Sequence, residues 1–399
     1  MAEGPRLTFF GKLIVFLVLV GCGYLAYRYL AGGQSWPWQR ARTEAPASSG
    51  GGAPGGAAAI GVAYGTEKKP WLEWAVHEFA NTKDGKDVRI ELIPMGSLEA
   101  AQALLAGDHR IHVWSPASAL YKQIFLQEWS VKQSGMPIVR EENLALTPMV
   151  FVMWDERYQA FVRKYGKVTF ETIRQALQEK SGWQTIANRP DWGIFKFGHT
   201  HPGQSNSGIM TLVAMAYEYH KKSRALELQD ILDPGFQTWM GEIESGVTGL
   251  SNSTGNMMRE MVLKGPSSFD VLFVYENVAI DHLKNAEGRW GQLRTIYPER
   301  NIWNENPYYI LDTPWSTKEQ REASAKFLDF LLSETVQQQA LVHGFRPGNP
   351  AVPVRTATSP FTTQAAAGLQ IDVGTICEPP RAEVVSNLLS SWQRQYGVR

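Results

Sequence analysis

The strongest constraint on the fold is an alternation of short apolar segments with longer segments of helical periodicity, which begins at Ile60. Residues 60–64, 88–93 and 110–114 have the length and composition of strands, and each precedes a turn and a helical segment. Three successive βαβ units predict a parallel sheet with helices on its faces. No repeat of fixed period is visible, which sets solenoids and propellers aside. The sequence therefore predicts an α/β fold.

A long extended segment, residues 143–154, interrupts this regular pattern. It exceeds the roughly five or six residues of a typical strand, and Pro148 breaks its hydrogen bonding. Because a strand that leaves one sheet and enters another has these properties, we expect two lobes. The strongly apolar strand at 269–275 is the expected return crossing. Helices of the second lobe are expected at 169–180, 207–221, 235–245 and 254–264.

The segments after the return crossing are expected to complete the first lobe. Strands are predicted near 293–297 and 307–311, followed by a helix at 318–342. The last helical segment, 380–396, is expected to dock on the same lobe. The predicted domain boundaries are 60–146 and 278–399 for lobe 1 and 147–277 for lobe 2.

The N-terminal 30 residues are set apart by their hydropathy. Residues 7–30 are apolar apart from two charged positions, and about 20 apolar residues span a bilayer as a helix. We therefore expect a transmembrane anchor, with residues 1–6 in the cytoplasm. In an alternative interpretation, residues 19–22 (LVGC) resemble a bacterial lipobox, in which the signal peptide is cut before Cys22 and this cysteine is lipidated. The uncleaved anchor is favoured because the apolar run continues beyond Cys22.

Both interpretations place the chain from residue 31 onward outside the cytoplasm. Its composition excludes several classes of partner. Residues 31–59, rich in Gly, Ala, Ser and Pro, predict a flexible tether. The chain has 39 Lys+Arg and 39 Asp+Glu, so it lacks the positive charge that attracts nucleic acid. Its two cysteines cannot build a disulfide framework or a Cys-rich zinc site. We expect a folded body that is tethered to the membrane and binds no nucleic acid.

Polar residues cluster in the turns that follow predicted strands, where helices begin. In open α/β sheets a ligand lies beyond the carboxyl ends of the strands, where helix N-termini present unpaired N–H groups. These groups and nearby hydroxyls favour an oxyanion or a carboxylate-bearing solute, whereas Glu67 and Glu276 would suit a cation or a sugar hydroxyl. Ser, Thr and Asn are also ordinary N-cap residues, so a capping role stays open for each. The candidate ligand-binding residues are Thr66, Glu67, Ser97, Ser115, Ser118, Thr147, Ser205, Asn206, Ser207, Tyr275 and Glu276.

Motifs of catalysis and cofactor binding are not found in the sequence. Residues 203–207 do not match the G-x-S-x-G nucleophile elbow, because position 207 is Ser. There is no H-E-x-x-H motif and no G-x-x-x-x-G-K-[ST] loop, and no G-x-G-x-x-G loop follows a predicted strand. We therefore expect no enzyme, no catalytic residue, no metal site and no cofactor.

Several motifs, in order along the chain, resemble those of a known family. They are GxEKxxWLxxAxxxF from Gly65, SPAS from Ser115, SNSG from Ser205, STGNMMREMV from Ser253, GPSSFDVLFVYEN ending at Asn277, and GFRPGNP from Gly344. Over roughly residues 60–355 the chain resembles the extracellular solute-binding proteins of bacterial transport systems, the two-lobed type II periplasmic binding proteins. The resemblance implies two α/β lobes joined by two hinge strands, placed here at 143–150 and 271–277, with a solute held in the cleft between the lobes.

The expected function follows from these features together. It is a membrane-tethered, extracytoplasmic solute-binding protein that closes around a small molecule or ion and presents it to a membrane transporter or sensor. An oxyanion or carboxylate-bearing solute is favoured, and a sugar is possible. The alternative is a cell-surface protein-interaction module that has the same fold but serves no transport, and whose surface-protein partner is a separate chain.

Overall fold

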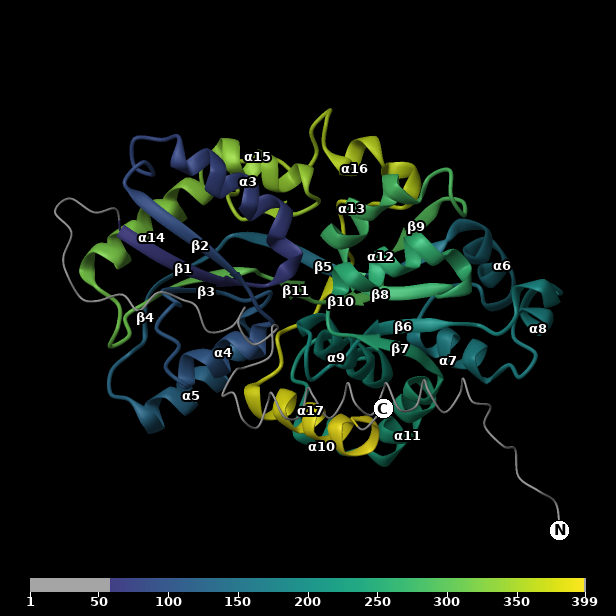
Figure 1. The fold of residues 1–399 in the computed structure, drawn as a ribbon. Coiled ribbons are helices and arrows are strands. Elements are labelled where there is room, and N and C mark those ends of the chain that lie inside the picture. The colour runs from purple at the N-terminus through teal and green to yellow at the C-terminus, as the bar shows by residue number, and fades with distance from the viewer. Residues whose placement is uncertain (1–57, 398–399) are drawn as a thin grey trace, which may run out of the picture. The chain divides into compact units, whose positions relative to one another are not determined.

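The first sheet contains the three N-terminal strands that the sequence predicts (Figure 1). The computed structural model describes residues 58–397. In the order β2-β1-β3-β12-β4, the strands are Val88–Pro94, Ala58–Tyr64, Val113–Ser115, Pro307–Leu311 and Ile138–Asn143. Strand β1 is parallel to β2 and β3, whereas β12 is antiparallel to β3 and β4. The sheet is therefore mixed, and the parallel arrangement expected from the βαβ units holds for its first three strands.

Helices cover both faces of this sheet. Successive strand residues point to opposite faces, so each face packs against its own set of helices. Val62 and Val113 pack in one core cluster with the buried faces of α3 and α14, whereas Ala63 and Trp114 pack in the other cluster with α4 and α5. Burial on both faces explains the apolar sequences of the inner strands β1, β3 and β12, whereas the edge strands β2 and β4 carry charged residues. The associated helices are η1 (Thr66–Lys68), α3 (Lys69–Ala80), α4 (Ser97–Leu105), η2 (Ala119–Tyr121), α5 (Lys122–Lys132), α14 (Lys318–Leu331) and α15 (Glu334–Val342).

The second sheet is also mixed and has the order β11-β5-β8-β6-β7. Strand β8 is antiparallel to β5 and parallel to β6, and β6 is parallel to β7. Two further strands, β9 and β13, pair with β5. The strands are β5 (Ala145–Trp154), β6 (Phe197–Thr200), β7 (Val247–Ser251), β8 (Val271–Tyr275), β9 (Leu293–Ile296), β11 (Trp303–Asn304) and β13 (Arg346–Pro347).

The four helices predicted between the crossings are confirmed as α7 (Phe170–Gln178), α9 (Asn206–His220), α11 (Pro234–Gly246) and α12 (Thr254–Lys264). Helix α9 is buried around nearly its whole circumference, which explains its uniformly apolar sequence. The other helical elements of this part are α6 (Asp155–Tyr165), α8 (Trp183–Ala187), η3 (Pro190–Trp192), α10 (Leu228–Ile231), η4 (Gly265–Ser267) and α13 (Glu276–Ala286).

The chain crosses between the sheets at 143–145, at 304–307 and again between α15 and β13, at 343–346. The first crossing lies inside the long segment that the sequence singled out, since β4 ends at Asn143 and β5 begins at Ala145. The return crossing expected at 269–275 is wrong, because β8 lies wholly inside the second sheet, between β5 and β6. Its strong apolar character reflects complete burial in a central strand. The actual return is the polar segment Asn304 to Pro307, where the Asn306 carbonyl accepts a hydrogen bond from the Leu144 N–H group.

Two later elements also differ from their expected positions. Strand β9 was expected in the first lobe but pairs with β5 in the second sheet. The C-terminal helix α17 (Ala382–Tyr396) was expected to dock on the first lobe but packs beside α9 and α10 (Figure 1). The indole of Trp392 donates a hydrogen bond of 2.7 Å to Glu244 of α11, which attaches α17 to the second-sheet helices. Such contacts between distant segments leave no periodic signal in the sequence.

The remaining segment between β13 and α17 also lies along second-sheet elements. Strand β14 (Thr375–Ile376) pairs with β10 (Arg300–Asn301), and the short helices α16 (Pro360–Thr363) and η5 (Ala365–Ala367) precede it. Element η5 contacts β9. The end of the chain therefore adds a covering layer to the second part of the fold.

The N-terminal predictions fall outside the described residues. These are the cytoplasmic residues 1–6, the segment 7–30 and most of the tether at 31–59, whose last two residues belong to β1. Within residues 58–397, none of the helices combines the length and apolar character needed to cross a bilayer.

Candidate functional site

A cavity of about 840 Å³ lies where several helices begin, and we call it the cleft. Strands β1, β2, β6 and β7 end at Tyr64, Pro94, Thr200 and Ser251, and the turns that follow them supply most of the lining. These turns lead into η1, α4, α9 and α12. The cleft is therefore formed by elements of both sheets, at the strand ends where open α/β folds hold ligands.

Six of the eleven predicted residues line this cavity, and five do not. The lining residues are Thr66, Glu67, Ser97, Ser205, Asn206 and Tyr275. Ser115, Thr147 and Ser207 are completely buried behind it, Ser118 lines a different cavity, and Glu276 is enclosed at the start of α13. The structure thus brings together residues from four separate turns and separates others that follow the same kind of strand.

The sequence interpretation missed the lining residues at the start of α12. Asn252, Ser253, Thr254, Asn256 and Arg259 face the cleft. The helix was predicted at 254–264, but the preceding strand β7 (VTGLS) was not, because it is short and Gly249 has a φ of 77°. A strand signal there would have identified this turn as another ligand-binding candidate.

Buried hydroxyls join the starts of α9 and α12. Ser207 Oγ lies 2.6 Å from Thr200 Oγ1, 2.6 Å from Thr254 Oγ1 and 3.2 Å from Ser205 Oγ. Because Ser207 is fully buried, it holds the cleft-lining Ser205 and Thr254 in place without lining the cavity itself.

Asn206 is committed to contacts within the protein. Its side-chain amide donates hydrogen bonds to the Tyr275 hydroxyl at 2.9 Å and to Asn304 Oδ1 at 3.0 Å. Its Oδ1 accepts a hydrogen bond of 2.9 Å from the Ser118 hydroxyl. Burial raises the pKa of Tyr275 well above its ordinary value, so this side chain is a neutral phenol. Asn206 therefore links η2 of the first sheet to the second sheet and to the return crossing.

Glu67 enters the cleft already paired with a lysine. The fully buried Lys68 ammonium donates to Glu67 at 2.6 Å, to the Pro116 carbonyl at 3.2 Å and to Asn306 Oδ1 at 3.1 Å. Burial lowers the pKa of Lys68, although the adjacent Glu67 carboxylate opposes this shift. The Glu67 charge is consequently compensated on the protein side of the cavity.

Glu276 is fixed by a buried ion pair and does not face the cleft. Arg346 donates two hydrogen bonds of 2.8 Å to its two carboxylate oxygens, and the Tyr297 hydroxyl donates another. Arg346 also donates to the carbonyl groups of residues 370 and 371. The carboxylate thus attaches the segment after β13 to α13 instead of binding a solute.

The charged groups of the cleft wall nearly balance. They are Glu67, Lys69, Glu99 and Arg259. Glu99 Oε2 accepts a hydrogen bond from the Gly96 N–H group at the start of α4. Arg259 donates to Asn256 at 3.2 Å, and no carboxylate among residues 58–397 forms an ion pair with it. Within the same residues, no cluster of three or more His, Cys, Asp or Glu side chains is arranged to hold a metal ion.

Known structures share this arrangement of two mixed sheets. The sulfate-binding protein SubI from Mycobacterium tuberculosis is 15% identical, with a TM-score of 0.54 over 85% of this chain and 99% of its own. A periplasmic thiamin-binding protein is 12% identical, with a TM-score of 0.57 over 84% and 95%. The periplasmic binding protein AfuA from Actinobacillus pleuropneumoniae, solved with fructose-6-phosphate, is 13% identical, with a TM-score of 0.56 over 86% and 99%. These likenesses show the fold of type II periplasmic binding proteins.

The sequence comparison is more specific. No curated protein sequence matches the chain. The family model described as bacterial extracellular solute-binding protein matches residues 60–346, which cover both sheets and every turn that lines the cleft. The protein therefore belongs to the bacterial extracellular solute-binding protein family, whose members are non-enzymatic components of transport systems.

Proposed function

We propose that the cleft captures a small anionic solute, either an inorganic oxyanion or a compound with a carboxylate or phosphate group. The start of α9 carries this proposal. Ser205 occupies its N-cap position, but its hydroxyl accepts no hydrogen bond from a first-turn N–H group and contacts the Ser207 hydroxyl instead. The Gly208 N–H group donates to the Ser205 carbonyl, so the N–H groups of Asn206 and Ser207 are the ones left at the start of α9 to bind a negative charge.

The charge distribution supports an anion over a cation. Arg259 reaches the cleft without a carboxylate partner among the described residues, whereas Glu67 is paired with Lys68. A guanidinium that is free of an ion pair binds carboxylate or phosphate through paired hydrogen bonds. Two proteins of similar fold are associated with anions of this kind: SubI is a sulfate-binding protein, and AfuA was solved with fructose-6-phosphate. A sugar is the second candidate, since hydroxyl and amide side chains from four turns surround the cavity.

Solute capture by this fold requires two lobes that move relative to each other. We propose the division made from the sequence, lobe 1 at 60–146 and 278–399 and lobe 2 at 147–277, with residues 278–304 and the segment from β13 onward transferred to lobe 2. The crossings at 143–145, 304–307 and 343–346 then serve as hinges. The Ser118–Asn206 hydrogen bond joins the lobes in the present structure. A solute that contacts both sides of the cleft favours the closed arrangement by its differential affinity.

A thermal-shift screen of the purified full-length chain tests the choice of solute. Sulfate, phosphate, citrate, glucose and Ca²⁺ represent the main solute classes. A ligand present at about 100 times its dissociation constant stabilises the folded state by roughly 2.7 kcal/mol. We expect hits among the anions only. Arg259→Gln should weaken the hit, and Lys264→Gln on the same helix, an exposed residue outside the cleft, should not.

Two results of this screen would redirect the proposal. A sugar hit that is insensitive to Arg259→Gln would replace the anion by a neutral solute held through side-chain hydroxyls and amides. No hit from a folded protein would favour the protein-interaction module, which uses an exposed face instead of the cleft.

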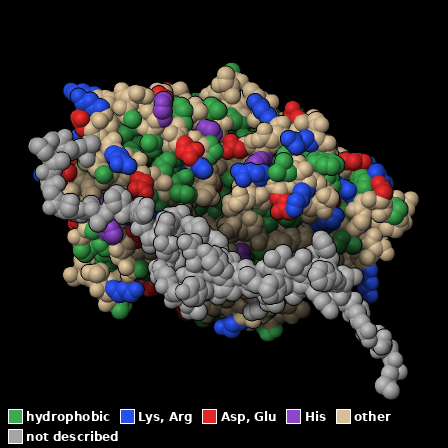
Figure 2. Space-filling view, viewed as in Figure 1, with side chains coloured by type: hydrophobic (Ala, Val, Ile, Leu, Met, Phe, Trp, Pro, Cys, Tyr) green, Lys and Arg blue, Asp and Glu red, His purple; other side chains and the backbone are tan. Residues whose placement is uncertain are grey.

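In Figure 2, basic and acidic side chains are interspersed over the visible face, so that face carries no large patch of one sign.

We further propose that residues 7–30 anchor this body to the cell membrane and that a membrane transporter or sensor receives the solute. Membrane fractionation checks the anchor, because deletion of residues 1–30 should release the protein from the membrane fraction. Cys22→Ser separates the two modes of attachment. A lipoprotein loses labelling by a fatty-acid analogue and its membrane attachment in this variant, whereas a transmembrane anchor keeps its attachment.

A further inference from the structure

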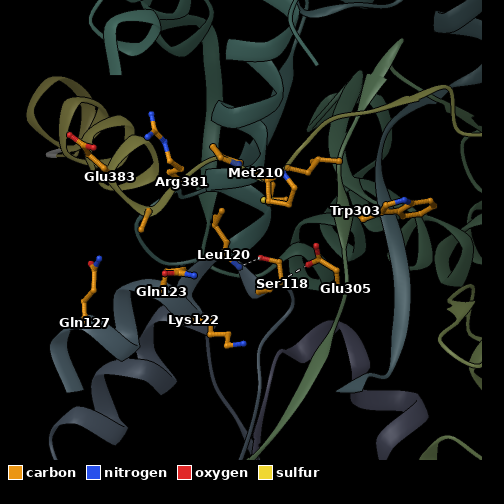
Figure 3. Close-up of a pocket in the computed structure, with 15 residues that line it drawn as sticks. Ser118, Leu120, Lys122, Gln123, Gln127, Met210, Trp303, Glu305, Arg381 and Glu383 are labelled. Atoms are coloured by element: carbon orange, nitrogen blue, oxygen red, sulfur yellow. Dashed lines mark hydrogen bonds between the residues drawn. The ribbon is translucent and has the colours of Figure 1, made fainter. Parts of the chain in front are cut away.

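A second cavity, of about 630 Å³, shares no lining residue with the cleft (Figure 3). Its walls come from η2 and the first turns of α5, from Met210 on α9, from Ile302, Trp303 and Glu305 at the return crossing, and from the chain entering α17. Ser118 lines this cavity and Asn206 lines the cleft, and the hydrogen bond between them forms part of the separating wall.

One wall of this cavity comes from outside the family-matched region. Residues 379–383 form it, whereas the family model ends at residue 346. The segment is held in place from both sides. The Tyr217 hydroxyl donates to the Glu378 carbonyl, and Trp392 attaches α17 to α11. The second cavity is therefore a feature of this chain and not of the matched family region alone.

Glu305 is the informative residue of the lining. Its Oε2 accepts a hydrogen bond of 3.2 Å from the Ala119 N–H group, and none of the Lys, Arg or His side chains in residues 58–397 forms an ion pair with it. Burial raises the pKa of this carboxyl group, while the hydrogen bonds from backbone N–H groups oppose the shift. A partly buried carboxylate without a cation is destabilising, and such groups mark candidate binding sites.

The cationic side chains that line the cavity, Lys122 and Arg381, do not pair with Glu305. Lys122 forms an ion pair with Glu141 and lies 5.7 Å from the centre of the Tyr309 ring. Arg381 and Glu383 extend from the start of α17 at the far end of the cavity from Glu305 (Figure 3). Neither Lys122 nor Arg381 forms an ion pair with Glu305 among the described residues.

The rest of the lining near Glu305 is largely apolar. Leu120, Met210 and Ile302, together with Pro379 and Pro380, supply hydrocarbon surface. A bare metal cation is a poor match, because hard cations require several oxygen ligands and this wall presents one carboxylate. We propose that the second cavity is a binding site for a small organic ammonium ion, with the ammonium group on Glu305 and an alkyl body against the apolar wall.

Calorimetric titration of the full-length chain with n-hexylammonium tests this site, with n-hexanol and n-hexanoate as probes of the same length. We expect saturable binding of one n-hexylammonium per chain and affinities for the alcohol and the acid that are weaker by about tenfold or more, the value of one charge-assisted hydrogen bond. Glu305→Gln keeps the shape of the side chain and should lose the preference for the amine. Glu305→Asp keeps the charge and should retain the preference.

Two controls separate this site from the cleft and from surface charge. Glu128→Gln removes an exposed carboxylate from α5 outside the cavity lining and should leave amine binding unchanged. Arg259→Gln in the cleft should also leave it unchanged, so a failed cleft proposal does not affect this result. The proposal is overturned if n-hexylammonium does not bind, or if it binds the wild type and Glu305→Gln equally.

Discussion

The starts of α9 and α13 show how similar strand-to-helix junctions acquire different roles. Both helices follow strands of the second sheet, and both junctions carry polar residues that the sequence marked as ligand candidates. At α9, Ser205 lines the cleft. At α13, Glu276 is closed off by Arg346 and Tyr297. The difference teaches that a residue at such a junction lines a cavity only where other segments of the chain leave its side chain uncovered.

The largest expected effect comes from removing Arg346, which pairs with the buried Glu276 carboxylate at the start of α13. Arg346→Met leaves the fully buried Glu276 carboxylate without its cation, which should lower the free energy of unfolding by about 3–5 kcal/mol. Urea unfolding of the purified protein measures this loss. Arg300→Met is the control, because its Glu299 partner is 67% exposed and such pairs contribute at most about 1 kcal/mol. Equal losses in the two variants would mean that the Glu276 pair is not sealed from water.

A second buried carboxylate, Asp270, differs from Glu276 because it is buried without a well-formed ion pair. Its Oδ2 accepts a hydrogen bond from the Lys196 N–H group, while its Oδ1 lies 3.5 Å from Arg157 Nε without a hydrogen bond. Burial raises the pKa of Asp270 to about 6 from an ordinary 3.8. The folded state therefore binds the proton more tightly than the unfolded state does, and Asp270 reduces stability as the pH rises from about 4 to 6.

The variant Asp270→Asn tests this sign, because it cannot titrate. Between pH 4 and pH 6.5, wild type should lose about 2–3 kcal/mol of unfolding free energy relative to the variant. Urea unfolding at both pH values gives the difference. Parallel pH profiles would show that Asp270 ionises in the folded protein with an ordinary pKa.

Behind the cleft, Ser207→Ala should have an intermediate effect on stability. The substitution removes the hydroxyl shared by Thr200 and Thr254, and buried partners left without a hydrogen bond cost about 1–3 kcal/mol. Solute affinity should fall as well, because Ser205 and the start of α12 lose their support. Thermal unfolding and solute titration on the same sample measure the two effects. An unchanged unfolding free energy would mean that the network contributes nothing to the fold.

On the open side of the same network, Ser205→Ala should change stability by less than about 0.5 kcal/mol, because its hydroxyl lines the cavity and does not cap α9. Its effect should appear in solute affinity, as a loss of about two- to tenfold. The contrast with Ser207→Ala is the informative quantity. A stability loss in Ser205→Ala without an affinity loss would place Ser205 among the structural residues.

The candidate site was predictable where a turn recognisable in the sequence also lines the cleft. Thr66 and Ser97 follow strands that the sequence predicts, Ser205 precedes the predicted helix at 207–221, and all three line the cleft. The contribution of α12 was missed because strand β7 is short and interrupted by Gly249. Tyr275 is predicted as a ligand-binding residue at a hinge; it does line the cleft, but from the end of a central strand. Its position depends on the neighbours of β8, which periodicity does not reveal.

The sequence by itself determined the α/β class, the first three strands, the central helices, the first crossing and the family. These features depend on apolar periodicity and turn chemistry within short segments, which local residues control. Only the tertiary structure decided that β8 is a central strand, that the return crossing is 304–307 and that the C-terminal segment covers the second-sheet helices. It also decided which carboxylates are neutralised, because Glu276 meets a cation 70 residues further along the chain and Glu305 meets none among the described residues.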